Sequence, residues 1–312
     1  MPVAITVLIA SRNRAQSLAK TLESVFSPSN VAQPDWEVIV ADNGSSDSTS
    51  EVVQRFASVH RNVRYLLQTR KGKSNALNSG IAAANGELIG MIDDDVICAH
   101  DYISGIRKTF AENSTDAVQG RTFLACEGGE PAYLHRDLAM FMGLRDFGNE
   151  PCELKANLCG TNSVVRAAVF KSVGGYSVEL GAGAVGFAED SEMSQRIRSH
   201  GFRLSYAPDI VVTHQLPRDR ITASSFRRRY FGLGRSNALR ESMPVPLWRF
   251  GMFVAREACV QLPLAFWQGI IGNPAESLRS QCRLLEWAGF LVGHWQFRRR
   301  AARPLPISQA GE

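Results

Sequence analysis

Residues 71–95 read KGKSNALNSGIAAANGELIGMIDDD, and this stretch decides the fold class. Its part from 75 to 84 is expected to form a helix. Residues 88–92 are a short apolar run, which is typical of a strand buried on both faces. The run leads directly into three aspartates at 93–95. We therefore expect three acids at the carboxyl end of a buried strand.

The same alternation of strand and helix runs through the preceding residues. Short runs rich in Val and Ile predict further buried strands at 3–10, 37–41 and 63–67. Helices are expected between them, at 15–26 and 50–57. This order predicts an α/β fold, with an open and mainly parallel sheet that carries helices on both faces.

Polar clusters follow three of these strands, at 11–13, 42–43 and 93–95. In open α/β sheets, ligands bind beyond the carboxyl ends of the strands, so we expect three loops to converge on one crevice. Adjacent carboxylates repel one another and are tolerated where a cation compensates them. Their hard oxygens suit Mg²⁺ or Mn²⁺. The alternative is a solvated turn with capping aspartates.

The bulk composition leaves the choice of partner open. The chain has 312 residues and a net charge of +5, and its pI is about 9.0. A basic chain suits nucleic acid, nucleotides, phospholipid headgroups or polyprenyl phosphates. The six cysteines have no metal-binding spacing, which favours free thiols in a reducing compartment. The apolar N-terminus is interpreted as a first strand rather than a signal peptide.

The chain changes character after the acidic triplet. Residues 117–217 mix short strands with Gly-rich turns, and one helix is expected at 189–200. Residues 218–240 carry seven arginines. Residues 246–297 are apolar and aromatic, which fits helices lying in a membrane interface; the alternative is an extension packed on the domain, or a dimer face.

Five motifs, in the right order, resemble glycosyltransferase family 2. They read VLIASRNRAQSLAKTLESV, EVIVADNGSSDST, KGKSNALNSGIAAANGELIGMIDDD, GTNSVVRAAVFKSVGGY and GFAEDSEMSQRIRSHGFRLSYAPDIVVTH. The resemblance covers residues 3–216. It implies a GT-A fold (a Rossmann-like sheet) and transfer of a sugar from a nucleoside diphosphate sugar to a hydroxyl, with inversion at the anomeric carbon.

The resemblance also assigns the acids. Asp93 and Asp95 match the first and last acids of the DXD motif, so they are the expected metal ligands. His214 is either a third ligand or structural. Asp190 matches the catalytic base, whereas an acidic pair that only favours the helix dipole is the alternative. Glu189 either orients the acceptor or caps the helix.

The remaining matched positions would line the substrates. Gly160 and Asn162 match a loop near the acceptor and the donor sugar, and Arg229 and Arg235 are candidates for gripping the diphosphate. The residues expected on the donor side are Ser11, Asn13, Arg14, Asp42, Lys73, Asn75, Asp93 and Asp94.

These observations predict a nucleotide-sugar half at 1–98, an acceptor half at 99–217 and a helical extension at 218–312. The expected partners are a nucleoside diphosphate sugar, most commonly of UDP, a glycan or lipid-linked acceptor, and a peripheral membrane surface. No nucleic acid is expected. The expected location is the cytoplasm, with a peripheral place on the inner face of the membrane, and the expected pathway is cell-surface glycan or polysaccharide synthesis.

Two other functions compete with this interpretation. A nucleotidyltransferase would carry a Gly-rich loop after the first strand, but Ser11-Arg12-Asn13-Arg14 contains no glycine. A non-catalytic, basic protein that binds membrane or nucleic acid would explain the arginines but not the acids at 93–95 and 190. The chain lacks the QxxRW pattern of processive synthases, which favours addition of single sugars.

Overall fold

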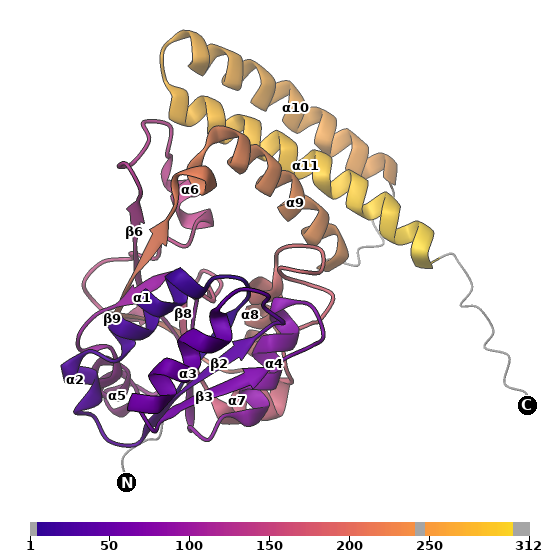
Figure 1. The fold of residues 1–312 in the computed structure, drawn as a ribbon. Coiled ribbons are helices and arrows are strands. Elements are labelled where there is room, and N and C mark those ends of the chain that lie inside the picture. The colour runs from indigo at the N-terminus through magenta and orange to yellow at the C-terminus, as the bar shows by residue number, and fades with distance from the viewer. Residues whose placement is uncertain (1–4, 241–246, 302–312) are drawn as a thin grey trace, which may run out of the picture. The chain divides into compact units, whose positions relative to one another are not determined.

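The computed structural model describes residues 5–240 and 247–301 and divides into two compact units (Figure 1). The first unit comprises residues 1–184 and 188–221, and it contains the sheet. The second comprises residues 185–187 and 222–312, and its described part is mostly helical.

The N-terminal half of the first unit is a parallel α/β layer. Its strands lie in the order β3-β2-β1-β4 and are parallel to one another. The strands are β1 (Ile5–Ser11), β2 (Trp36–Asp42), β3 (Val63–Leu67) and β4 (Leu88–Ile92). The helices between them are α1 (Ala15–Val25), α2 (Pro28–Val31), α3 (Thr49–Val59) and α4 (Lys73–Ala83). The predicted strand and helix order is confirmed here.

The sheet continues beyond β4 as a mixed sheet, in the order β8-β6-β9-β5. β8 is antiparallel to β4 and to β6, whereas β6 and β9 are parallel. The strands are β5 (Val96–Cys98), β6 (Ala117–Cys126), β7 (Cys152–Glu153), β8 (Asn162–Arg166) and β9 (Leu204–Leu216). The helices are α5 (Tyr102–Glu112), α6 (Arg136–Phe141), α7 (Ala167–Val173), α8 (Glu189–Ser199) and the 3₁₀ turn η1 (Arg218–Ile221).

Two hydrophobic clusters cover the two faces of this sheet. Strand β1 alternates between them, because Val7 and Ile9 belong to one cluster and Leu8 to the other. Leu22 of α1 packs in the first cluster, and Phe170 of α7 packs in the second. Helices therefore bury both faces, as an α/β sheet requires, and β1 is mostly apolar because it has no solvent-facing side.

The described part of the second unit consists of three helices, α9 (Ala223–Arg240), α10 (Leu247–Ile270) and α11 (Pro274–Ala301). α10 and α11 form a hairpin whose turn contains Gly272 at φ 76°. The side-chain oxygen of Asn273 accepts a hydrogen bond from the Glu276 amide and so caps α11. None of the helices within 5–240 and 247–301 is long and apolar enough to cross a membrane.

Glycines bring α9 and α11 into close contact. A Cβ at Gly234 of α9 would overlap the carbonyl oxygen of Glu286, and a Cβ at Gly289 of α11 would overlap that of Phe231. Gly293, one turn beyond Gly289, lies against the backbone of Arg235. The two backbones touch directly, so this crossing tolerates no larger side chain.

We expect Gly289→Ala to destabilise the protein by about 1–3 kcal/mol, because the new methyl group would force α9 and α11 apart. Gly269→Ala on α10 is the matched control, since its Cβ would make only an ordinary contact 3.7 Å from Ser277 Oγ. That control should be neutral or stabilising by about 0.5–1 kcal/mol. Chemical denaturation of both variants checks the prediction, and equal stabilities would contradict the close crossing.

Candidate active site

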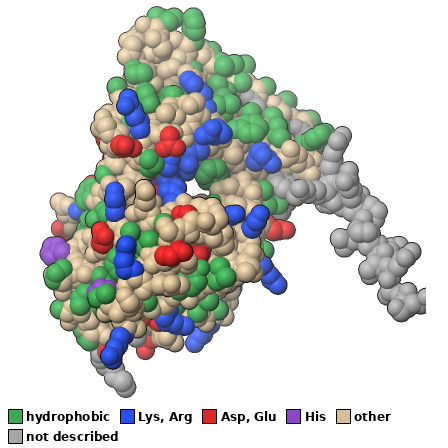
Figure 2. Space-filling view, viewed as in Figure 1, with side chains coloured by type: hydrophobic (Ala, Val, Ile, Leu, Met, Phe, Trp, Pro, Cys, Tyr) green, Lys and Arg blue, Asp and Glu red, His purple; other side chains and the backbone are tan. Residues whose placement is uncertain are grey.

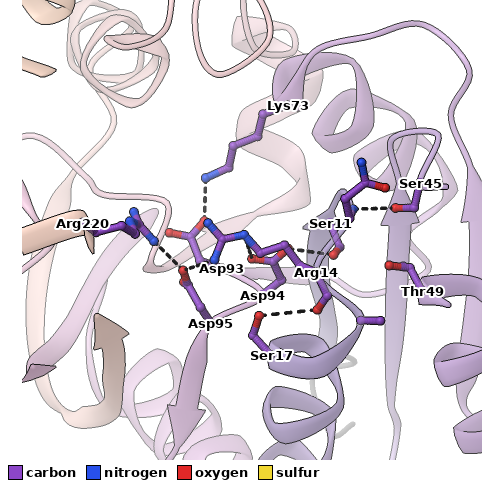
Figure 3. Close-up of polar contacts among 12 residues, drawn as sticks. Ser11, Arg14, Ser17, Ser45, Thr49, Lys73, Asp93, Asp94, Asp95 and Arg220 are labelled. Atoms are coloured by element: carbon purple, nitrogen blue, oxygen red, sulfur yellow. Dashed lines mark hydrogen bonds and ion pairs between the residues drawn. The ribbon is translucent and has the colours of Figure 1, made fainter. Parts of the chain in front are cut away.

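The carboxyl ends of β1, β2 and β4 meet at one edge of the sheet. Ser11 and Asp42 are directly paired in the register of β1 and β2, and the aspartates 93–95 follow β4. The Ser11 hydroxyl donates to Asp94 Oδ2 at 2.7 Å, which joins the first loop to the triplet (Figure 3). The structure therefore brings together the loops that the sequence pattern expected to converge.

A metal-type cluster forms at the triplet. One ligand atom each of Asp93, Asp95 and His214 lies within 4.8 Å of the others. The strand pairing causes this arrangement, because Val96 of β5 is the direct partner of His214 in β9. The imidazole Nε2 thereby lies 3.1 Å from Asp95 Oδ1, and both side chains are almost completely buried.

The protonation of the two ring nitrogens of His214 shows whether a cation fits this cluster. Its Nδ1 lies 2.8 Å from the carbonyl oxygen of Met142, which can only accept, so Nδ1 carries a proton. In the neutral ring Nε2 then has a lone pair, and this lone pair faces a carboxylate oxygen. Nε2 has no hydrogen-bond donor among the described residues. Two buried acceptors in contact repel one another, and a metal ion bound to both would remove this repulsion.

Two arginines already lie on Asp95. Arg220 Nη1 is 2.6 Å and Arg14 Nη1 is 3.0 Å from Asp95 Oδ2 (Figure 3). Burial alone would raise the pKa of this carboxyl, but His214 and the two guanidinium groups lower it far below its usual value. Asp95 is therefore ionised across the physiological range. Arg220 is one of the seven arginines in residues 218–240, and nothing in the sequence distinguishes it from the others.

Lys73 connects the triplet to the acids of α8. Its Nζ donates to Asp93 Oδ1 at 2.6 Å. Burial alone would lower the pKa of Lys73, but the carboxylates of Asp93, Asp190 and Glu189 raise it well above its usual value. The same ion pair outweighs burial at Asp93 and lowers that pKa. Lys73, for which we expected a role on the donor side, thus neutralises a buried acidic cluster.

Asp190 is held with one oxygen bound and the other oxygen without a partner. The backbone amide of Gly160 donates to Asp190 Oδ2 at 2.8 Å. Asp190 Oδ1 is buried and has no hydrogen-bond partner among the described residues. Ala188, which precedes the acidic pair, has φ 78°, a left-handed conformation that costs energy for a residue with a Cβ. A strained helix start therefore presents a carboxylate oxygen that can still accept a proton.

Both acids of the pair are harder to ionise than free carboxylates. Burial, reinforced by the nearby charge of Asp190, raises the pKa of Glu189 to about 7. Burial also raises the pKa of Asp190, although Lys73 and the Gly160 amide oppose it. Raised carboxyl pKa values of this kind are common where an enzyme keeps its acid and base groups.

The second loop surrounds Asp42. Both oxygens of this buried carboxylate are used, one by Ser45 at 2.6 Å and the other by the Tyr65 hydroxyl at 2.7 Å. Asn13, at φ 53°, accepts from the Ser46 amide and thereby ties the first loop to the second. Asn75 donates to the carbonyl of Lys71 at the start of α4. These contacts fix the second loop and the start of α4, and the expected donor role of these residues stays a prediction.

Asn162 occupies a different place from the one expected. It is fully buried, and its amide donates to the carbonyls of Arg121 and Ile210 while its oxygen accepts from Tyr102. Every polar group of the side chain is therefore used inside the sheet, which makes it structural. Arg229 and Arg235 lie on α9 in the second unit. Their expected contact with a diphosphate stays a prediction.

Comparison with known proteins decides the family. The model described as Glycosyl transferase family 2 matches residues 6–174, more than half of the chain. The chain belongs to this family. The matched residues include the triplet, Lys73 and Gly160, whereas Asp190 and His214 lie beyond them.

Relatives and solved structures agree with this membership. The glycosyltransferase AglE of Haloferax volcanii is 26% identical over 212 residues, which are 67% of this chain and 66% of AglE. A poly-beta-1,6-N-acetyl-D-glucosamine synthase of Staphylococcus epidermidis is 24% identical over 65% of this chain and 48% of its own length. The mannosyltransferase PcManGT of Pyrobaculum calidifontis, solved with GDP-Man and Mn²⁺, has a TM-score of 0.58 at 21% identity, with 98% of this chain and 77% of PcManGT covered. This likeness confirms the GT-A-type fold.

The chain spans between about half and two thirds of the length of the first curated relatives that it matches, namely 66%, 51% and 48%. The substrates of those proteins are therefore not assigned to this chain on the basis of the match.

Proposed function

We propose that the protein is a metal-dependent, inverting glycosyltransferase that moves a sugar from a nucleoside diphosphate sugar to a hydroxyl of an acceptor. The observation that carries this proposal is a pair of functional groups on either side of Lys73. On one side lies the cluster of Asp93, Asp95 and His214. On the other side lies Asp190, with its unpartnered oxygen.

The chain's own residues would perform most of the chemistry. Asp190 Oδ1 would accept the proton of the attacking hydroxyl, while the Gly160 amide holds Oδ2 and so fixes the direction of the free oxygen. Lys73 would keep Asp93 ionised and offset the negative charge near Asp190. Attack from the side opposite to the leaving phosphate inverts the anomeric carbon, as in other displacements at that carbon.

The orphaned Nε2 of His214 and the two carboxylates suit a divalent cation. Such an ion would act as a Lewis acid on the departing nucleoside diphosphate. Both Mg²⁺ and Mn²⁺ suit carboxylate ligands, and the imidazole nitrogen favours Mn²⁺ because Mg²⁺ prefers oxygen. PcManGT, which has a similar fold, was solved with Mn²⁺, and this supports the proposal.

The donor side would consist of the loops after β1, β2 and β4. Asp42, Asn13 and Lys73 are proposed to face the nucleoside and its phosphates, and UDP is the first nucleotide to try. GDP is the second, because PcManGT was solved with GDP-Man. Arg229 and Arg235 are proposed to grip the diphosphate, which the guanidinium geometry favours.

The acceptor is proposed to be a growing cell-surface glycan or polysaccharide, either free or linked to lipid. The similarity to a poly-beta-1,6-N-acetyl-D-glucosamine synthase supports a role in glycan synthesis. Residues 1–98 would form the donor half and residues 99–217 the acceptor half, and residues 218–312 would form the extension. We place the reaction in the cytoplasm, beside the inner face of the membrane.

A transfer assay tests this function. The protein is incubated with Mn²⁺ and a series of UDP-, GDP-, dTDP- and CDP-sugars, and release of the nucleoside diphosphate is measured. We expect one nucleotide class to be cleaved, only with metal, and faster when a hydroxyl acceptor is added. Failure to cleave or bind any nucleotide sugar would contradict the proposal.

Arg220→Gln is expected to tighten the binding of Mn²⁺ in the absence of nucleotide by about two- to fivefold. The reason is that a cation entering the cluster must displace or oppose the guanidinium that lies 2.6 Å from Asp95, and an ion pair of this exposure is worth about 0.5–1 kcal/mol. The free ion is followed by electron paramagnetic resonance during a titration.

Arg218→Gln is the matched control for Arg220→Gln. It removes the same charge from the same turn, but the Arg218 side chain is exposed and has no contact with Asp95. Its affinity for Mn²⁺ should stay that of the wild type. An Arg220 variant that binds Mn²⁺ no better than this control would mean that the guanidinium does not compete for the site.

A further inference from the structure

The outer face of α10, defined here by Leu262, Phe266, Trp267 and Ile270, is apolar and open to solvent. These four side chains are between 58% and 72% exposed. Met252 and Trp248, which lie nearer the N-terminal end of the helix, are exposed to the same degree. In Figure 2 hydrophobic side chains gather along the edge of the molecule where Figure 1 draws α10. A soluble protein rarely leaves so many large apolar side chains together in water.

The inner face of α10 is polar. Gln261 is only 7% exposed, and the Glu257 side chain is 15% exposed. Both face α11, because Arg283 of α11 lies 3.9 Å from Glu257 and Gln261 approaches the same carboxylate. The Ser277 hydroxyl of α11 donates to the carbonyl of Ala265, the next residue of this stripe. Helix α10 therefore has polar residues inside and apolar residues outside.

This arrangement of polar and apolar faces is the reverse of the one expected for a helix in water. An amphipathic helix in water turns its apolar stripe toward the protein and its polar stripe outward. In the second unit, the polar face of α10 makes its contacts with α11, and the apolar face is left exposed. Aromatic side chains such as Trp267 and Phe266 are the residues that settle at a membrane–water boundary.

Charge identifies the kind of surface. Residues 222–312 contain 13 arginines, no lysine and five acids, a net charge of +8. The other residues hold 22 basic and 25 acidic side chains, a net charge of −3. The basic character of the whole chain thus comes entirely from the part that bears the apolar face. Arginine binds phosphate through two parallel hydrogen bonds, so this part suits anionic phospholipid headgroups.

We propose that the outer face of α10 rests in the interfacial layer of a bilayer that contains anionic phospholipid. The helix lies along the surface, with Phe266, Trp267 and Ile270 among the upper acyl chains and exposed arginines such as Arg256 of α10 among the phosphates. This inference does not depend on the proposed sugar transfer. A second copy of the chain is the other occupant that could cover such a face, and the experiment separates the two.

Flotation with vesicles tests the proposal on the full chain. Vesicles of phosphatidylcholine alone are compared with vesicles in which phosphatidylglycerol replaces a third of it. The wild type should float with the anionic vesicles, and added salt should weaken this binding. The variant Phe266→Ser/Trp267→Ser should bind at least about tenfold more weakly, since two large side chains no longer leave water. Val31→Ser/Val59→Ser removes exposed apolar groups from the first unit and should bind like the wild type.

Two further measurements make the outcome decisive. Thermal unfolding of the Phe266/Trp267 variant should match that of the wild type, because both residues are exposed and their loss leaves the fold intact. Sedimentation velocity without lipid should show a monomer for both proteins. The proposal is overturned if the wild type does not bind anionic vesicles or if the variant binds them as well as the wild type. It is also overturned if the wild type is a dimer and the variant is a monomer. Asp190→Asn should bind vesicles like the wild type, because membrane binding does not depend on the proposed catalytic base. A failure of the sugar-transfer proposal would therefore leave the membrane proposal untouched.

Discussion

Replacing Asp190 by asparagine is expected to lower kcat by about 10²–10⁴-fold and to leave the affinity for the nucleoside diphosphate unchanged. The amide can still accept the hydrogen bond from the Gly160 amide, so the loop stays in place. It cannot accept the proton of the attacking hydroxyl, because an amide is not a base at neutral pH. The rate of transfer from the nucleotide sugar that the wild type cleaves, with its hydroxyl acceptor, checks this.

Glu192→Gln is the control on the same helix. Glu192 pairs with Arg196 at 2.6 Å, one turn along the surface, so its loss should change kcat by less than about threefold. An Asp190→Asn enzyme that keeps a similar share of activity would mean that another group takes the proton. The wild type should also show an acid limb, since kcat/KM falls as Asp190 becomes protonated. Burial raises the pKa of Asp190, so this limb should lie above the usual range of aspartate.

Replacing Asp95 by asparagine is expected to weaken Mn²⁺ binding in the presence of nucleoside diphosphate by at least about 100-fold. The carboxylate is the member of the cluster that faces His214, Arg14 and Arg220 together. Without its charge, the two guanidinium groups would repel an entering cation instead of being neutralised. Calorimetric titration of Mn²⁺ into each protein measures the effect.

Asp101→Asn provides the comparison for this second prediction. Asp101 is an exposed aspartate that precedes α5, so its replacement removes one negative charge without touching the cluster. Mn²⁺ affinity should be that of the wild type. If Asp95→Asn and Asp101→Asn bind Mn²⁺ equally well, the metal site lies elsewhere or does not exist.

The parallel half of the sheet could be predicted from the sequence because its signals are local. Each strand is a short apolar run buried on both faces, and the strands at 63–67 and 88–92 have the ends that the pattern predicted. The helices between them follow from the spacing of apolar side chains. The order of polar loops after the strands then indicates where a ligand binds, since parallel strands point their carboxyl ends the same way.

Contacts between distant segments could not be predicted in this way. The pairing of β5 with β9 puts His214 against Asp95, and η1 delivers Arg220 to the same carboxylate, yet both lie more than a hundred residues from it. Asn162 was expected near the acceptor and the donor sugar because it sits in a family motif, but its amide is used by carbonyl groups inside the sheet. Tyr65, which bonds Asp42, lies on a strand whose pattern shows no sign of that contact.

The helical extension shows the same division. Its composition predicted helices with apolar faces, and helices are present. Composition could not reveal which face of α10 is turned outward, because that depends on the packing of α11 against Glu257 and Gln261. Nor could it reveal that glycines let α9 and α11 touch, since a glycine in a helix has several other uses.

The most direct test of the central claim is thermal unfolding of the wild type with UDP, GDP, dTDP, CDP or ADP, each with Mn²⁺ and with chelator. A nucleoside diphosphate at 100 times its dissociation constant should add about 2.7 kcal/mol of stability. The account predicts that one diphosphate stabilises the protein with Mn²⁺ and does so far less with chelator. If no diphosphate shifts the transition under either condition, the cluster of Asp93, Asp95 and His214 does not serve a nucleotide sugar.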